Sequence, residues 1–568
     1  MLLTPNSRYT IPMNHPSKNF NSFVTKCKQW ITSPLANNHL RLLSLFVFLT
    51  SLVIGFGTRI VAVFQDTESF GDVARDLYVY QGMWKGTFPL LGPESSFGLF
   101  HLPPLYYYLV WPFTIFSPNP IWPALVSAAL SFLSIPLFAF LVYKLLQGTQ
   151  KEYRFFLSAL AGLWWSCLFP DVLLANRAWN PSPSSFFLFA FILTWNWLWE
   201  SIPNYTNPVK NTAQPSPKKQ LLFTRSTLLW ALYGFLFSLL TSMHSSLWFL
   251  LPLLFIGTLL LFSYAKRNYI GPVISLLVST LFALPYLVGE SNSSWGNTKK
   301  LVEVLTTQST KSTLFSVIDR LFFTLFENSK LAYFFIPNLF VFACFFVTVV
   351  ALLSLLSFKG NKTIYYSFIW LYGLFLLIAA NFQGPLYIHY LLPICSLPVT
   401  ASLTALAYFP FNRNVLTKLL AGFIIFSLLL SFYANMHNLK AYLSAKYGPV
   451  RLVNTQDIID AIKEIPTRSI VCVDPRYLES YHYIDEFITK NKIVWHRYGD
   501  CQQSQIYLLR NYALDIKSID IPHDPRQQST FYYNYIHTGP VKQTMSESGW
   551  VFWKEVGNHQ VFKAVGQG

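Results

Sequence analysis

The chain has 568 residues, of which 53% are hydrophobic, 18% aromatic and only 12% charged. A soluble protein of this size needs more charge to cover its surface, so the composition indicates a membrane protein. The net charge of +17 does not indicate a nucleic-acid-binding protein, because much of the excess lies in short segments between apolar runs. No zinc-finger spacing, aromatic RNA-binding motif or basic tail accompanies it.

The first segment, residues 1–41, is polar and carries several lysines, so it is expected to be a cytoplasmic N-terminal tail. The apolar run that follows, 42–63, is too long for the core of a cleaved signal peptide and has no obvious cleavage site. It is therefore interpreted as an uncleaved signal anchor and as the first membrane span.

Residues 42–435 are expected to form a transmembrane module, because long apolar runs recur throughout this part of the chain. Most of these runs are long enough to cross a hydrocarbon core of roughly 30 Å at about 1.5 Å per residue. The predicted fold class is therefore an α-helical polytopic membrane protein. About eleven runs are predicted to be spans: 42–63, 121–147, 155–175, 184–200, 226–243, 245–263, 269–289, 332–357, 364–381, 387–409 and 415–435.

Basic residues in the short connections set the predicted orientation of this module. With the N-terminus inside, an odd number of spans places the C-terminal region outside. The protein is expected in the plasma (inner) membrane, in contact with membrane lipids. Every second connection then falls on the cytoplasmic side and carries lysine or arginine: Lys144, Lys151, Arg154, Lys210, Lys218, Lys219, Arg225, Lys266, Arg267, Lys359, Lys362, Arg413 and Lys418.

The segment "PPLYYYLVWPFTIF" (103–116) decides this assignment. It is hydrophobic but short, rich in aromatic residues and interrupted by Pro112. Counting it as a span would invert every later connection and place the lysines outside. It is interpreted instead as an interfacial or re-entrant helix in an outer loop, 64–120, because Tyr and Trp rings gather at membrane interfaces.

From residue 436 onward the composition is ordinary for a soluble domain, so 436–568 is expected to form a small extracytoplasmic α/β domain. Cys472 and Cys501 fall in this region, and a disulfide and two reduced thiols are equal alternatives for them. No GxGxxG, Walker A, HExxH or DxD motif occurs in the sequence. The predicted elements are helices at 454–465 and 480–491, strands at 469–475 and 492–500, and a hairpin at 549–565 that turns at Gly557-Asn558.

The stretch "GDVARDLYVYQGMWKG" (71–86) follows the first span. As a helix it would place Asp72 and Asp76 one turn apart, beside an apolar stripe. Two interpretations remain open: a solvated polar face in which Arg75 pairs with a carboxylate, or a functional cluster at the outer face. The stripe would consist of Val73, Leu77, Tyr80 and Trp84.

Further polar residues are expected at the same outer face, at the ends of other spans. Any one of them has a simpler structural explanation, such as snorkelling to water. Because they come from separate outer segments, together they predict a cavity open to the outer leaflet. No dense set of metal ligands occurs, so no cofactor is predicted, and a divalent metal between Asp72 and Asp171 is a minor alternative. The residues are His101, Asp171, Asn176, Arg177, Asn180, His244, His389 and Tyr390.

These motifs resemble the GT-C superfamily of polytopic glycosyltransferases, and most of all the branch with the protein O-mannosyltransferases and the lipid A aminoarabinose transferase. The resemblance covers roughly residues 42–290. Two positions depart from the family pattern: the usual Asp-Glu pair is Asp72-Val73 here, and His101-Leu102 replaces the common Lys before Pro-Pro. The matching pieces are "GDVARDLYVYQGMWKGTFPL" (71–90), "HLPPLYYYL" (101–109) and "DVLLANRAWNP" (171–181).

The resemblance implies an enzyme that transfers a sugar from a polyprenyl-phosphate-linked donor to a protein, lipid or glycan acceptor at the outer face. It implies that Asp72 is the catalytic carboxylate and that the transfer inverts the sugar. Arg75, Arg177 and His101 are candidates for holding the phosphate. Asp171 is a candidate for acceptor binding.

Three other classes of protein are alternatives. A transporter or flippase of lipid-linked saccharides would place charged or broken helices near the membrane midplane and would show an internal repeat, which the sequence does not contain. An assembly protein would leave Asp72 without a role. A polysaccharide polymerase or ligase works at the same face on similar donors and remains the nearest alternative.

Overall fold

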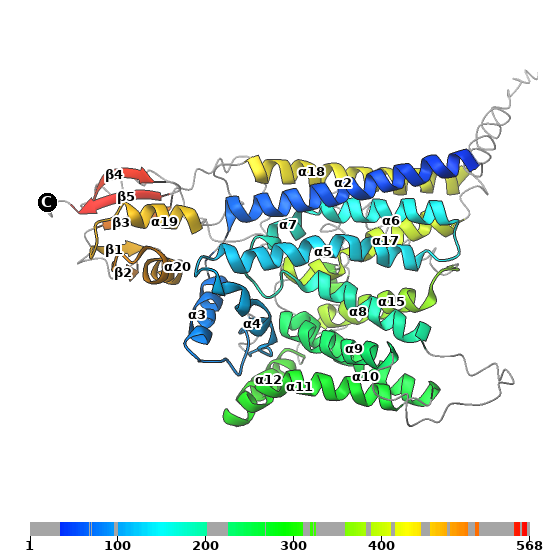
Figure 1. Cartoon of the computed structure of the whole chain (residues 1–568), viewed down its shortest axis with the longest axis horizontal. Helices are drawn as coiled ribbons and strands as arrows, with labels where there is room; N and C mark the ends of the chain where they lie inside the picture. The colour runs from blue at the N-terminus through cyan, green and yellow to red at the C-terminus, as the bar shows by residue number, and fades with distance from the viewer. Residues whose placement is uncertain are drawn as a thin grey trace, which may run out of the picture.

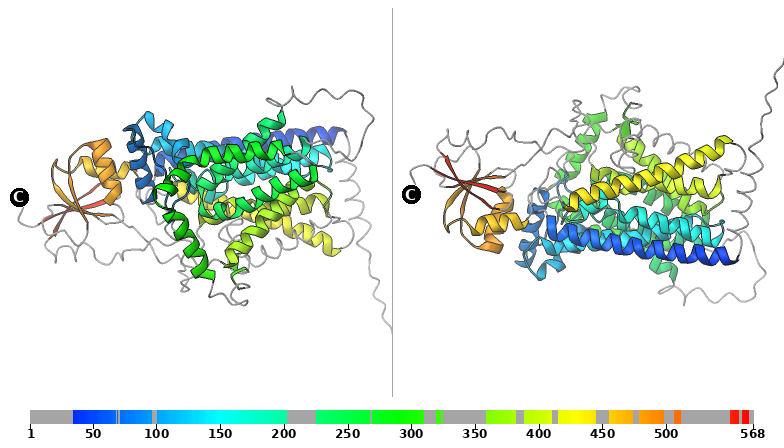
Figure 2. Two further views of the ribbon diagram at one scale, coloured as in Figure 1. Left: turned by 90° about the horizontal axis from the view of Figure 1, so that it is seen from below. Right: turned by 90° about the horizontal axis from the view of Figure 1, so that it is seen from above.

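The protein is a bundle of long helices with a small mixed sheet beyond one end (Figure 1). The two side views place the sheet at the same end, next to helix α3 (Figure 2). The computed structural model describes residues 34–67, 69, 71–95, 100–201, 225–266, 269–309, 319–321, 323–324, 358–381, 388–409, 415–444, 455–473, 478–497, 506–510, 550–556 and 559–564.

Long apolar helices form the bundle, as the sequence predicts. Helix α2 packs along α6, α6 packs against α5, and α9 contacts both α8 and α11. The bundle helices are α2 (Pro34–Asp66), α5 (Ile121–Leu145), α6 (Lys151–Ser166), α7 (Phe169–Ala175), α8 (Ser184–Ser201), α9 (Arg225–Met243), α10 (Ser245–Lys266), α11 (Ile270–Asn292), α12 (Gly296–Ser309), α15 (Lys362–Asn381), α16 (Ile388–Leu391), η3 (Leu392–Ile394), α17 (Ser396–Tyr408) and α18 (Val415–Ser444).

Five of the described helices are long and apolar enough to cross a membrane, and a sixth span results if the bent pair α6 and α7 is counted as one. The prediction of an α-helical polytopic membrane protein is thereby confirmed. The number of eleven spans stays a prediction, because the run 332–357 lies outside the described residues. The five helices are Asn38–Gln65, Ile121–Leu145, Ser226–Met243, Ile270–Asn292 and Val415–Ser444.

The run 155–175, predicted as one span, is bent by 53° between α6 and α7. Leu168 has an extended backbone conformation at the break, and Pro170 lies in the first turn of α7. Proline lacks the N–H that would continue the α6 hydrogen-bond ladder, so a new helix starts at this point. The run 387–409 is likewise divided into α16, η3 and α17, with Pro393 in η3.

Close helix contacts in the bundle depend on small residues. Gly55 of α2 faces α5 and α6, and a methyl group at this position would overlap Ile135. Gly162 of α6 approaches Ala139 of α5 in the same way. Without the hydrophobic effect to drive helix association in lipid, such close approach provides the van der Waals contact that holds these helices together.

One end of the bundle collects the connections that are predicted to be cytoplasmic. Arg41 at the start of α2 pairs with Glu152 of α6 at 2.7 Å. The Asn361 N–H before α15 donates to the Leu145 carbonyl of α5 at 3.0 Å, and the Tyr408 hydroxyl of α17 donates to the Gln147 carbonyl at 2.7 Å. Within the described residues, the connections 145–151 and 358–361 therefore meet at one end, while α3 lies at the other (Figure 1).

The segment 103–116 forms α4 (Leu105–Val110) and the 3₁₀ helix η1 (Trp111–Ile115). Neither is long enough to cross a bilayer. The prediction that this segment is no span is confirmed. The alternation of the later connections between the two sides stays a prediction.

The C-terminal region contains the predicted alternation of helices and strands. The sheet order is β2-β1-β3-β5-β4; β1 pairs parallel with β2 and β3, whereas β5 pairs antiparallel with β3 and β4. Helix α18 continues to Ser444, beyond the predicted boundary at residue 435. Cys501 and the turn Gly557-Asn558 lie outside the described residues. The elements are α19 (Thr455–Lys463), β1 (Ile470–Val473), α20 (Leu478–Ile484), η4 (Asp485–Thr489), β2 (Val494–Arg497), β3 (Ile506–Arg510), β4 (Trp550–Val556) and β5 (His559–Ala564).

Candidate functional site

Helix α3 (Asp72–Trp84) carries the first candidate residues. It begins after Gly71, whose φ of 56° is a backbone conformation that favours glycine. The predicted apolar stripe is largely buried: Val73, Leu77 and Tyr80 are at most 4% exposed. Trp84 is 40% exposed instead, and its indole N–H donates to the Thr114 hydroxyl at 2.8 Å.

Arg75 joins the two carboxylates of α3. Its Nη1 donates to Asp72 Oδ1 at 2.9 Å, and its Nε and Nη2 donate to Asp76 Oδ1 at 2.9 and 2.8 Å. The two acids differ in surroundings, because the Asp72 side chain is 47% exposed whereas Asp76 is fully buried. Arg75 thus forms ion pairs with both carboxylates, and of the three residues only Asp76 is shielded from solvent.

Three tyrosines enclose Asp76, and we call Tyr80, Tyr106 and Tyr107 the tyrosine cage. The Tyr107 hydroxyl donates to Asp76 Oδ1 at 2.8 Å, and all three rings are buried. Asp76 Oδ2 has no hydrogen-bond partner within the described part of the chain. Burial raises the pKa of Asp76 to about 6, although the nearby Arg75 guanidinium opposes this shift.

A second cluster gathers candidate residues from three other segments. We call Trp179, His244, His389 and Tyr390 the histidine cluster. The His389 ring centroid lies 4.5 Å from that of Trp179 and 5.0 Å from that of His244, and Tyr390 lies 4.6 Å from His244. Arg177 is close enough to act electrostatically on His389.

The histidine cluster lies at the same end of the bundle as α3. Helix α4, which carries two residues of the tyrosine cage, packs on α9. His244 directly follows the last residue of α9, Met243. The structure therefore brings His244, His389 and Tyr390 together.

Asp171 has a different partner from those the sequence analysis considers. Its Oδ2 accepts hydrogen bonds from Arg59 Nη2 and from the Ser131 hydroxyl, both at 2.5 Å. Arg59 and Asp171 are each 1% exposed. This buried ion pair joins α2 to α7, and Asp171 Oδ1 has no hydrogen-bond partner among the described residues. In the described residues there is no group of three or more His, Cys, Asp or Glu side chains that could hold a metal ion.

The connection between α7 and α8 is packed into the protein rather than spread over its surface. Asn176 donates to the Tyr442 hydroxyl of α18 at 2.9 Å, and Asn180 donates to the Met243 carbonyl at the end of α9. The Phe169 N–H donates to Asn435 Oδ1 at 2.9 Å. Asn176 and Asn180 thus hold this connection between two helices.

His101 also makes structural contacts. Its ring Nδ1 lies 2.9 Å from the Gly92 carbonyl oxygen, so Nδ1 carries the proton and donates. Its backbone N–H and carbonyl both bond to the Asn297 side chain at the start of α12. These bonds fix the outer loop to α12.

Helix α20 packs against α3 on the side away from the tyrosine cage. Gln81 Nε2 donates to the Tyr483 hydroxyl at 3.2 Å, and that hydroxyl donates to the Pro118 carbonyl at 2.7 Å. The Tyr78 and Tyr483 rings meet edge to face with centroids 5.2 Å apart, and the Tyr78 hydroxyl lies 3.3 Å from His482 Nδ1. The helix with the candidate acids is therefore fixed from both sides.

The partners of Asp76 and Asp171 are not evident from local sequence patterns. Tyr107 and Tyr106 belong to the segment 103–116, where the sequence indicates only interfacial aromatic residues. Arg59 is a charged residue inside the first apolar run, and a buried charge in a span needs a partner. The charge of Arg59 within an apolar run is therefore the sequence signal that it has a buried partner.

Solved structures similar to this chain are of two kinds. ArnT from Cupriavidus metallidurans has a TM-score of 0.48 in the apo state and 0.46 when bound to undecaprenyl phosphate, each at 8% identity. The two alignments cover 91% and 92% of this chain and 97% and 98% of ArnT. The Archaeoglobus fulgidus oligosaccharyltransferase complex with Zn and sulfate has a TM-score of 0.45 at 11% identity over 81% of this chain. This chain covers 63% of that protein, less than two thirds.

No protein-family model and no curated protein matches the sequence of this chain. ArnT and the oligosaccharyltransferase are both GT-C glycosyltransferases. The solved proteins to which this chain is similar thus belong to the GT-C superfamily, which its sequence also resembles.

Proposed function

We propose that this chain is a membrane glycosyltransferase that moves a sugar from a polyprenyl-phosphate donor to an acceptor hydroxyl. The observation that carries the proposal is the arrangement on α3. Asp72 is half-exposed and therefore accessible to a substrate, while Arg75 is held in place by the buried Asp76. An accessible carboxylate that is fixed in this way suits a general base.

The proposed reaction is a single displacement at the anomeric carbon. The acceptor oxygen forms a bond to C1 of the sugar as the bond from C1 to the phosphate oxygen breaks, and the electron pair leaves with the polyprenyl phosphate. Asp72 accepts the proton of the acceptor hydroxyl. One carboxylate suffices for this route, and the sugar is inverted because no covalent glycosyl-enzyme forms.

The departing phosphate needs a positively charged group that stabilises its negative charge. Among the described residues, we assign this role to Arg177. It is close enough to act electrostatically on His389 of the histidine cluster. A guanidinium binds phosphate oxygens in a bidentate manner. The rings of Trp179, His389 and Tyr390 offer faces on which a sugar packs. In this proposal no cofactor takes part, since a base and a cation suffice for the displacement.

We place the reaction at the extracytoplasmic face of the plasma membrane. The shared end of the basic connections supports a cytoplasmic location for that end, which leaves α3 and the C-terminal α/β domain outside. The acceptor is a protein, lipid or glycan hydroxyl.

The decisive variant is Asp72→Asn. We expect it to lose about 10²- to 10⁴-fold in transfer rate, the usual contribution of a general base. The assay incubates purified protein with a panel of radiolabelled polyprenyl-phosphate sugars and membrane acceptors. Glu94→Gln is the matched control, because Glu94 is an exposed carboxylate of the same outer loop.

Unfolding temperature and gel filtration verify that each variant is folded. Full transfer by Asp72→Asn would overturn the assignment of the base. Movement of the lipid-linked sugar across the membrane without transfer would overturn the proposed glycosyltransferase activity and favour a flippase.

A further inference from the structure

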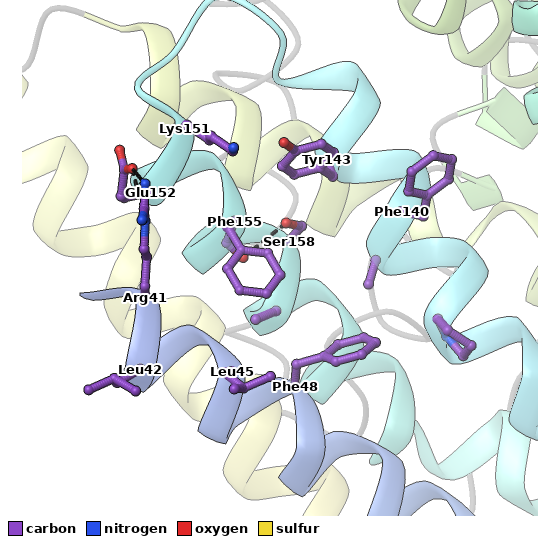
Figure 3. A pocket seen from close by; sticks show the side chains of 13 residues that line it. Arg41, Leu42, Leu45, Phe48, Phe140, Tyr143, Lys151, Glu152, Phe155 and Ser158 are labelled. Carbon is purple, nitrogen blue, oxygen red and sulfur yellow. Dashed lines mark hydrogen bonds and ion pairs between the residues drawn. The ribbon is translucent and has the colours of Figure 1, made fainter. Parts of the chain in front are cut away.

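A groove opens between α2, α5 and α6 at the end of the bundle opposite α3. It encloses about 550 Å³, a volume within the range of small-molecule sites. Its walls are mostly apolar, with Leu45, Phe48, Phe140 and Phe155 around the space (Figure 3). A ligand in this groove therefore needs an apolar body.

Charged side chains line one rim of the groove. Arg41 bonds to Glu152 through Nε at 3.1 Å and Nη2 at 2.7 Å. Lys151 is exposed at the same rim and makes no hydrogen bond or ion pair with any part of the chain that the structure describes. Figure 3 shows Arg41 reaching Glu152 at one side of Phe155, with Lys151 close to Glu152.

Arg154 adds a third positive charge next to the groove. Its guanidinium lies 4.0 Å above the Tyr143 ring and donates through Nη2 to the Tyr143 hydroxyl at 2.7 Å. Among the described residues, Glu152 is the only carboxylate that lines the groove, so Arg41, Lys151 and Arg154 leave this rim with an excess of positive charge. A ligand that matches the rim carries a negative head group.

This groove is separate from the proposed reaction site. Arg41 and Asp66 lie 25 positions apart on α2, which corresponds to roughly 37 Å at 1.5 Å per residue. Helix α3 follows beyond Asp66. A substrate at Asp72 therefore does not reach the groove with its sugar or its phosphate.

We propose that the groove binds an anionic glycerophospholipid, with one acyl chain between α2, α5 and α6 and the phosphate at Lys151 and Arg41. Apolar walls beside a basic rim are the combination that such a lipid fits, and basic pockets between spans are known to bind anionic head groups. The cavity takes one acyl chain, whereas a polyprenyl chain is several times longer. Anionic lipids are supplied by the leaflet that faces the predicted cytoplasmic end.

Native mass spectrometry of the full chain in detergent tests the proposal. The probes are a phosphatidylglycerol and a phosphatidylcholine with identical acyl chains. We expect one phosphatidylglycerol to be retained in preference to phosphatidylcholine. Lys151→Gln should weaken this retention about fivefold, because one basic residue near an anionic lipid contributes about 1 kcal/mol. Lys144→Gln is the matched control: Lys144 lies at the same end but pairs with Glu200 and does not line the groove.

A second variant acts on the acyl chain instead of the charge. Ala159 lines the groove, so Ala159→Phe places a ring in the space and should abolish retention of the phospholipid without changing the rim. If this variant does not fold, the comparison of Lys151→Gln with Lys144→Gln tests the proposal by itself. Equal retention of the two phospholipids, equal losses in the two lysine variants, or displacement of phosphatidylglycerol by one equivalent of undecaprenyl phosphate would each overturn the proposal.

Discussion

Asp72 and Asp76 stand one helical turn apart and have opposite surroundings. Asp76 is buried and shares the Arg75 guanidinium with the exposed Asp72. Pairs of carboxylates with different environments commonly divide their tasks. In the proposed enzyme Asp76 positions Arg75, and Arg75 in turn orients Asp72 toward the acceptor.

The buried Asp76 predicts an unusual dependence of stability on pH. Its pKa is about 6 in the folded protein, against 3.8 for a free side chain. Between these two values the folded state holds a proton that the unfolded state lacks, so stability falls as pH rises through this window and levels off above it. In Asp76→Asn this fall should be absent.

The measurement is the unfolding temperature of both proteins in detergent, at intervals between pH 4 and pH 7. The difference between the wild type and Asp76→Asn should change across the window and level off towards pH 7. Parallel curves would contradict the burial of the acid.

The Arg59–Asp171 pair predicts a second, larger effect. Arg59→Met leaves a buried carboxylate without its guanidinium, and we expect a loss of about 3–5 kcal/mol in the free energy of unfolding. The double variant Arg59→Met with Asp171→Leu should be more stable than either single variant, because no buried charge is left unpaired. Titration with a denaturing detergent measures these differences, and strictly additive losses would refute the pairing.

At the scale of elements, α3 is held between two neighbours. Its buried face meets α4 through the tyrosine cage, and its other side meets α20 through Tyr78, Gln81 and Tyr483. A short helix outside the bundle has little stability of its own. The order of the proposed reaction site therefore depends on α20 as well as on the bundle.

Tyr483→Phe tests this dependence by removing one hydroxyl that bonds to both Gln81 and Pro118. A net loss of about 1 kcal/mol per hydrogen bond is expected. Only the bond to Gln81 lies on α3, so amide hydrogen exchange there should become roughly fivefold faster. Tyr433→Phe is the control, since Tyr433 is 65% exposed on α18. Unchanged exchange in α3 would show that α20 does not stabilise it.

Local patterns in the sequence predicted the elements well and their partners poorly. The spacing of Val73, Leu77 and Tyr80 was enough to predict helix α3 and its buried side. The burial of Asp76 was not predictable, because it depends on Tyr107, which follows 31 positions later and reaches Asp76 only through the fold. Asp171 and Arg59 are likewise 112 positions apart.

For the whole molecule, the positions of basic residues along the chain were the most informative signal. They required that 103–116 not be a span, and the structure has only the short α4 and η1 there. The 53° bend before α7 could not be placed from hydropathy, since both halves of 155–175 are equally apolar. Pro170 is the local signal for the bend, although proline occurs within straight spans as well, such as Pro136 in α5.

The buried α7–α8 connection affects how the topology of this protein can be mapped. Reporter tags are usually inserted between spans on the assumption that such segments are exposed. Here Asn176, Ala178 and Asn180 are at most 5% exposed. Asn176 donates to Tyr442 of α18, and Asn180 donates to the Met243 carbonyl of α9. A tag inserted at this point would disrupt the packing of the helices and would not report the side of the membrane. The side on which each connection lies is better determined with tags at other positions.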